Sequence, residues 1–140
     1  MEFTKWLEAQ MTLQQTLESL RVEFAKAAQK VYDEWEQGED DDLNGGGICQ
    51  DIADAIADVI YRHIPKVNAG PVSAACGEQH VWVMLHNTRQ GFEIDVPYHI
   101  YERGGGYSWT KIPGVMFDPR DIVIAPVNRM DAKNALDSGW

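Results

Sequence analysis

Residues 49–65 read CQDIADAIADVIYRHIP, and this stretch decides what kind of fold the chain can adopt. Its large apolar residues recur at steps of three and four, so they share one side of an α-helix. Those residues are Ile52, Ile56, Val59, Ile60 and Ile64. Asp58 and Arg62 fall on the other side at the spacing of an i,i+4 ion pair, and Pro65 ends the pattern. The sequence therefore predicts a helix over residues 49–64 that packs one face on a core.

A longer helix is predicted upstream, over residues 12–36, with Thr12 as its N-cap. Its apolar stripe consists of Leu13, Leu17, Leu20, Phe24, Ala27, Val31 and Trp35. We expect this stripe to pack in the core and Gly38 to end the helix. The run DEWEQGEDDD at 33–42 carries no base and is typical of a solvated helix end followed by an exposed loop.

After Pro65 the apolar period changes from that of a helix to that of strands. The segments HVWVML (80–85) and FEIDV (92–96) predict two strands joined by a turn over 86–91, and DIVIA (121–125) predicts a last strand. Residues 107–112 are a further candidate strand. Helices followed by antiparallel strands imply one α+β domain over 1–140, with an acidic helical region at 1–42 and the core at 43–140.

Charge and composition narrow the classes of function. Twelve basic against twenty-two acidic residues give a net charge of −10, which argues against binding to a nucleic-acid backbone. The chain has no run of eighteen apolar residues, and residues 1–20 lack the apolar segment of a signal peptide. Two cysteines are too few for a disulfide scaffold. We therefore expect a cytoplasmic protein with reduced thiols and no membrane partner, with signal-less export left open.

Reactive chemistry points first to Cys49, which follows the glycines at 45–47 and opens the helix at 49–64. A helix N-terminus favours a thiolate and lowers the pKa of a cysteine, whereas the neighbouring Asp51 opposes this. Glycines also let a substrate backbone approach the sulfur closely. The structural alternative is that Cys49 is a small buried residue at the start of a helix.

A thiolate needs a partner that moves protons, and His80 opens the HVWVML strand while Asp95 lies in the next strand. A hairpin that pairs His86 with Arg89 sets His80 opposite Asp95, and a register shifted by two leaves them diagonal. In either register the carboxylate can orient the imidazole while its other nitrogen points at the thiol. A shift by one residue would place Asp95 on the wrong face.

These pieces, GGGIC, HVWV and FEIDVP, resemble the transglutaminase-like core of the papain-like fold over residues 44–98. The resemblance implies an α+β core in which the cysteine-bearing helix packs on an antiparallel sheet. It also implies that Cys49 attacks an amide or ester carbonyl, that His80 transfers the proton and that Asp95 orients His80. Members of that superfamily include peptidases, amidases, deamidases and acyl transferases, which use neither metal nor cofactor for this step.

Candidate binding residues lie around these pieces. Asn44, together with the backbone N–H of Cys49, is the candidate oxyanion hole, although an asparagine before glycines is also typical of a turn. The candidate residues of the substrate groove are Gly47, Trp82, Tyr107 and Trp109. The expected partner is a protein, a peptide or a small amide substrate, and the sequence leaves the oligomeric state open.

Several alternatives stay open. In the related NlpC/P60-like hydrolases the third residue is often a histidine, and His99 can take that place instead of Asp95. The chain can also be a non-catalytic interaction module, or an acidic protein that binds a basic partner through residues 33–42. Cys76, His80, His63 and His86 lack the paired spacing of a zinc site, and we expect no metal.

Overall fold

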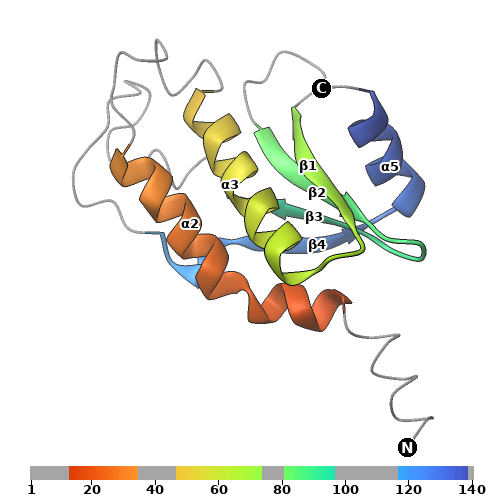
Figure 1. Cartoon of the computed structure of the whole chain (residues 1–140), viewed down its shortest axis with the longest axis horizontal. Helices are drawn as coiled ribbons and strands as arrows, with labels where there is room; N and C mark the ends of the chain where they lie inside the picture. Colours follow the sequence, from red (N-terminus) through yellow and green to blue (C-terminus); the bar gives the residue numbers. More distant parts are fainter. Residues whose placement is uncertain (1–12, 35–46, 74–80, 97–116, 139–140) are drawn as a thin grey trace, which may run out of the picture.

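Helices cover both faces of one antiparallel sheet (Figure 1). In the computed structural model the described residues are 13–34, 47–73, 81–96 and 117–138. The elements are α2 (Arg21–Glu34), α3 (Gly47–His63), β1 (Asn68–Ser73), β2 (Val81–His86), β3 (Gly91–Asp95), the 3₁₀ turn η3 (Pro119–Asp121), β4 (Val123–Val127) and α5 (Arg129–Asp137). The four strands follow one another across the sheet in chain order, and each neighbouring pair is antiparallel. The prediction of an α+β fold is confirmed.

The helix α3 is the predicted helix of residues 49–64, begun two residues earlier. Ile52, Ile56 and Ile60 are buried on its inner face, as the spacing predicts. The expected ion pair joins Arg62 Nε to Asp58 Oδ2 at 3.5 Å on the exposed face. Exposed pairs of this kind stabilise a helix by about 0.3–0.5 kcal/mol, so burial of the isoleucines decides which face turns inward.

The upstream helix differs from its prediction, because it is interrupted. Residues 13–19 are helical, Leu20 forms a turn, and α2 starts at Arg21. The Leu20 N–H is shared between the carbonyls of Thr16 and Leu17, both at 3.1 Å, and the Ser19 hydroxyl donates to the Thr16 carbonyl. A serine side chain that competes for a helix carbonyl commonly bends the helix.

The interruption changes which side of α2 is buried. Leu13, Leu17, Leu20 and Phe24 are buried as predicted, but the buried residues that follow are Ala25, Ala28 and Tyr32. Ala27 and Val31, which the periodicity assigned to the core, are only partly buried against it. Tyr32 is held by an edge-to-face contact with Phe117, whose ring centroid lies 5.6 Å away. Trp35 and Gly38 lie outside the described residues.

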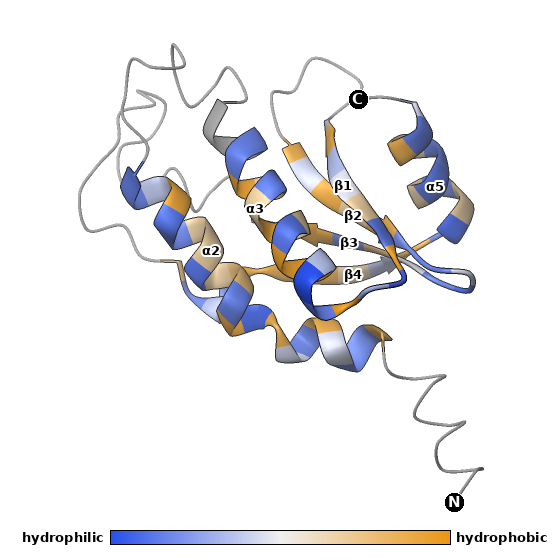
Figure 2. Ribbon diagram, viewed as in Figure 1, coloured by the Kyte–Doolittle hydropathy of each residue, from blue (hydrophilic) through white to orange (hydrophobic). Residues whose placement is uncertain are grey.

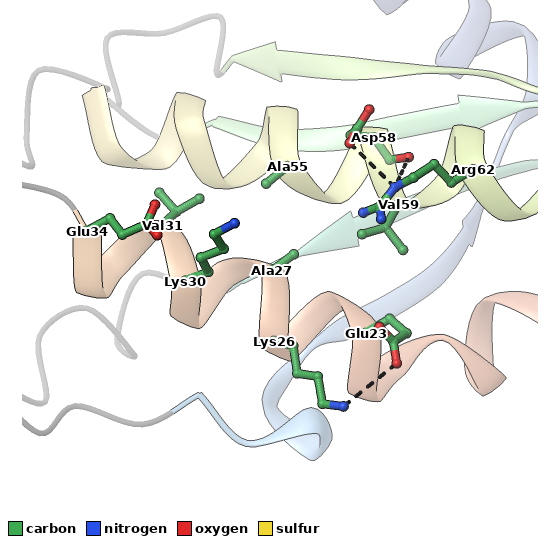
Figure 3. A pocket seen from close by; sticks show the side chains of 10 residues that line it. All are labelled: Glu23, Lys26, Ala27, Lys30, Val31, Glu34, Ala55, Asp58, Val59 and Arg62. Carbon is green, nitrogen blue, oxygen red and sulfur yellow. Dashed lines mark hydrogen bonds and ion pairs between the residues drawn. The ribbon is translucent and has the colours of Figure 1, made fainter.

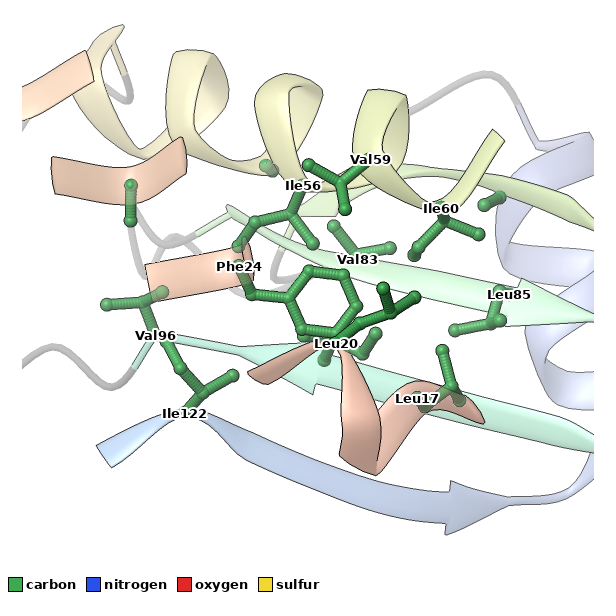
Figure 4. Packing of buried hydrophobic residues seen from close by; sticks show 14 of the residues in the cluster. Leu17, Leu20, Phe24, Ile56, Val59, Ile60, Val83, Leu85, Val96 and Ile122 are labelled. Carbon is green, nitrogen blue, oxygen red and sulfur yellow. The ribbon is translucent and has the colours of Figure 1, made fainter. Parts of the chain in front are cut away.

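The core lies between the two long helices and one face of the sheet (Figure 4). Phe24 of α2, Ile56 and Ile60 of α3, and Val83 and Leu85 of β2 belong to one buried cluster. Colouring by hydropathy shows the inner sides of α2 and α3 as apolar and their outer sides as polar (Figure 2). Because side chains alternate along a strand, Trp82 and Met84 of β2 point to the opposite face.

The opposite face of the sheet contacts α5, which the sequence analysis did not predict. A Cβ on Gly70 of β1, the partner of Met84, would lie 3.2 Å from Cδ2 of Leu136. The Asn128 side chain caps α5 by accepting the N–H groups of Met130 and Asp131. The helix is short and its only fully buried residue is Ala132, so its apolar period is weak.

Of the four strands that the structure describes, the sequence predicted three, with slightly different bounds. The strands β2, β3 and β4 correspond to the strands predicted at 80–85, 92–96 and 121–125. Their bounds differ from the predicted ones by one or two residues. The strand β1 was not predicted, because it contains Pro71, which a sheet accepts at its edge. The Tyr61 hydroxyl donates to the Ala69 carbonyl at 2.6 Å and accepts the Ala69 N–H at 2.9 Å, which covers part of that edge. The candidate strand 107–112 lies outside the described residues.

In the described part of the chain, no helix combines the length and the apolar character needed to cross a lipid bilayer.

Two glycines of the sheet allow a test of how closely α5 and its connection pack. A Cβ on Gly91 would lie 2.9 Å from Cα of Arg129 and 3.0 Å from the Val127 carbonyl oxygen, both backbone atoms. We expect Gly91→Ala to lower the free energy of unfolding by about 1–3 kcal/mol, the usual cost of overpacking. Urea titration followed by circular dichroism measures it.

The matched control is Gly70→Ala, whose Cβ would meet only the end of the Leu136 side chain. That side chain can move, and alanine restricts the unfolded chain, so the change in stability should stay within about 1 kcal/mol. Equal losses for the two variants would contradict this account of the packing.

Candidate functional site

Three chain segments that carry the predicted catalytic residues begin or end at the same end of the sheet. The helix α3 runs in the same direction as β2, and β3 runs back against β2 (Figures 1 and 4). The beginning of α3, the beginning of β2 and the end of β3 therefore lie at the same end. In sequence, Cys49 belongs to the first turn of α3, His80 directly precedes Val81, and Asp95 is the last residue of β3.

Of these three residues, the structure describes the side chain of Asp95 alone. The Cys49 side chain and all of His80 lie outside the described residues. Asn44, Tyr107 and Trp109, together with the alternative third residue His99 and with Cys76, also lie outside them. Gly47 is the first residue of α3, and Trp82 is half-buried in β2.

The hairpin between β2 and β3 fixes the register on which the pairing of His80 with Asp95 depends. His86 pairs with Gly91 and Val83 with Ile94, which is the register shifted by two from the pairing of His86 with Arg89. The turn is held by the Asn87 side chain, which accepts the N–H groups of Arg89 and Gln90 at 2.8 and 2.7 Å. Continued by one residue, this register sets Trp82 beside Asp95. His80 itself lies outside the described residues.

The faces of the sheet add a constraint that the sequence did not show. Ile94 is fully buried in the cluster beneath α3, so Asp95 and Glu93 point to the other face. Asp95 thus shares a face with Trp82 and stands at the end of its strand, across the sheet from α3. An imidazole that contacts both the Cys49 thiol and Asp95 must therefore lie at the end of the sheet, where the two faces meet.

The acidic side chains on this face influence each other. Partial burial raises the pKa of Glu93 above its ordinary value of 4.5, and the negative charge of Asp95 raises it further. The sequence analysis did not identify Glu93, although its place two residues before Asp95 in FEID already put both acids on one face. The two carboxylates make this face electronegative next to the candidate catalytic end.

A separate groove of about 440 Å³ lies between α2 and α3 (Figure 3). Ala27, Val31, Ala55 and Val59 form its apolar part, and charged side chains of both signs surround them. Two ion pairs lie on its rim, Lys26–Glu23 at 3.9 Å and Arg62–Asp58 at 3.5 Å. Its three acidic and three basic side chains balance in charge, and its two lysines are exposed.

Neither metal coordination nor similarity to a known protein identifies the site. Among the described residues, no three histidine, cysteine, aspartate or glutamate side chains are grouped so as to hold a metal ion. Comparisons of the chain with known protein families, with curated proteins and with solved structures find no match.

The raised pKa of Glu93 predicts how stability depends on pH. Between the ordinary carboxyl pKa and the raised one, the folded protein binds a proton that the unfolded chain has lost, so stability falls as the pH rises through that window. At pH 7 the full cost of ionising Glu93 is present. Glu93→Gln should therefore raise the melting temperature at pH 7, and the gain should vanish below pH 4.5.

Glu34→Gln is the matched control, because Glu34 is exposed at the end of α2. It removes the same charge without a buried environment, and its effect should be small at both pH values. Melting curves at pH 4 and pH 7 measure both variants. A gain for Glu93→Gln that persists unchanged at pH 4 would show that ionisation of Glu93 is not its cause.

Proposed function

We propose that the protein is a thiol-dependent hydrolase or acyl transferase that acts on an amide bond through Cys49, His80 and Asp95. The observation that supports this most directly is that the beginnings of α3 and β2 and the end of β3 lie at the same end of the sheet. These are the places where the sequence carries a cysteine, a histidine and an aspartate. The covering of this sheet by α3 also agrees with the cysteine-bearing helix of a transglutaminase-like core.

In the proposed reaction, His80 takes the proton of the Cys49 thiol, and the thiolate attacks the carbonyl carbon of the amide. The tetrahedral oxyanion is stabilised by the backbone N–H of Cys49 and the Asn44 side chain. His80 then gives the proton to the departing amine, which leaves a thioester on Cys49. Water releases a carboxylic acid from the thioester, and a second amine in place of water forms a new amide.

The helix N-terminus and the acidic face each favour one member of a thiolate–imidazolium pair. Unpaired N–H groups in the first turn of α3 favour the thiolate, and an imidazolium beside it favours it further. Glu93 and Asp95 favour a protonated His80, because each carboxylate attracts positive charge. The proposal therefore assigns the resting state to a thiolate–imidazolium pair, with Asp95 as the residue that positions the imidazole at the sheet end.

The decisive experiment measures how fast iodoacetamide alkylates Cys49 as a function of pH, in a Cys76→Ala background so that one thiol reacts. We expect an apparent pKa near or below ~7, against ~8.5 for a free cysteine, and a rise toward the free value in His80→Ala. Asp95→Asn should shift the profile in the same direction by less. Asp54→Asn, a charge change on the exposed side of α3, should leave it unchanged.

Activity follows from the same set of variants. Hydrolysis of fluorogenic peptide amides should fall by at least about a thousandfold in Cys49→Ala and in His80→Ala. A simple titration of Cys49 near ~8.5 that His80→Ala does not change would contradict the catalytic pair. The chain would then be a non-catalytic module in which these residues are structural.

A further inference from the structure

A second cavity lies at the other end of β2, away from the candidate catalytic residues. It has a volume of about 330 Å³ and is lined by side chains of α3, β1, β2 and α5. His86 ends β2 and lines the cavity, Asn68 is its direct partner on β1, and Tyr61 comes from α3. Lys133, Leu136 and Asp137 come from α5. A cavity of this size holds a small molecule but not a folded partner.

His86 is the feature of this cavity that packing does not explain. It is 5% exposed and is the one buried polar or charged residue among the described residues. Its Nδ1 atom has no hydrogen-bond partner within the described part of the chain. An unsatisfied buried polar group costs about 1–3 kcal/mol, and a leucine at this place would avoid that cost. His86 lines the cavity, although its Nδ1 atom itself has almost no accessible surface. Because packing alone does not explain a histidine at this place, the cavity beside the ring is the feature that can account for it.

The polar groups around His86 carry both signs of charge. Lys133 Nζ lies 2.6 Å from Asp137 Oδ2. This hydrogen bond lowers the pKa of Asp137, and the electrostatic effect of His86 also lowers it. Exposed i,i+4 pairs are weak, so a ligand can separate these two groups at little cost. Asp137 repels a ligand that carries only a negative charge, and Lys133 repels a ligand that carries only a positive charge.

We propose that this cavity binds a small zwitterion that carries an ammonium and a carboxylate group, of the type of a free α-amino acid with an apolar side chain. The ammonium pairs with Asp137, and the carboxylate pairs with Lys133 and accepts hydrogen bonds from His86 and Asn68. The side chain packs on Leu136 and on the Tyr61 ring, which is 49% exposed. The site stands independently of the proposed catalysis, because the six residues of β2, about 17 Å of strand, separate the two ends of the sheet.

Titration of the ¹⁵N-labelled full-length protein with L-leucine, followed by two-dimensional NMR, tests the site. The backbone amide signals of Asn68, His86 and Lys133 should shift and saturate at millimolar concentrations. Leucinamide lacks the carboxylate and 4-methylpentanoate lacks the ammonium, so each should bind at least about tenfold more weakly. Equal binding of either compound, or shifts that do not saturate, would overturn the proposal.

Two lysine variants separate this site from general charge effects. Lys133→Gln should weaken binding of L-leucine at least about fivefold, and it should not weaken the binding of leucinamide, whose ammonium Lys133 opposes. Lys26→Gln, on the exposed surface of α2, removes the same charge and should not alter either affinity. Because Lys133 is partly exposed, its replacement should not prevent folding, and the dispersion of the NMR spectrum verifies this directly. Unchanged binding of L-leucine to Lys133→Gln would also refute the site.

Discussion

The contact between the inner face of α3 and the sheet is the constraint on which the remaining structure depends. Ile56 and Ile60 meet Val83, Leu85 and Ile94 in one buried cluster. A fully buried side chain of this kind contributes about 1.5–3 kcal/mol, several times the contribution of a surface ion pair. The contact therefore fixes the rotation of α3 about its axis and its direction along β2. That direction brings the first turn of α3 to the same end of the sheet as the start of β2.

The same alternation of side chains gives the two faces of the sheet different roles. One face forms the core with α2 and α3, and the other carries Trp82, Glu93 and Asp95 at one end and His86 at the other. The helix α5 covers the His86 end, where the close approach of its start to Gly91 leaves no room for a Cβ. The acidic end and the His86 cavity thus lie apart on one face, held in place by the packing of the opposite face.

Two polar residues of the sheet stand where apolar ones would be more stable. Glu93 is partly buried beside a second carboxylate, and His86 is buried with Nδ1 unsatisfied among the described residues. Each lowers stability, yet both project from strands whose other face is tightly packed. A rigid strand holds such a side chain in a constant position, which is what a binding or catalytic group requires.

The sequence by itself determined the α+β class, the position and buried face of α3, the surface pair Asp58–Arg62 and the strands around Val83, Ile94 and Ile124. Each follows from a local period, which a single helix or strand satisfies alone. The sequence did not reveal β1, because its Pro71 fits only at a sheet edge. It also did not reveal α5, because the apolar face of this short helix is recognised only from its packing on the sheet at Gly70. It also placed Ala27 and Val31 in the core, because the turn at Leu20 is not visible in the period. Tertiary structure alone decided the hairpin register, the face on which Asp95 lies and the cavity at His86, because these depend on contacts between segments distant in the chain.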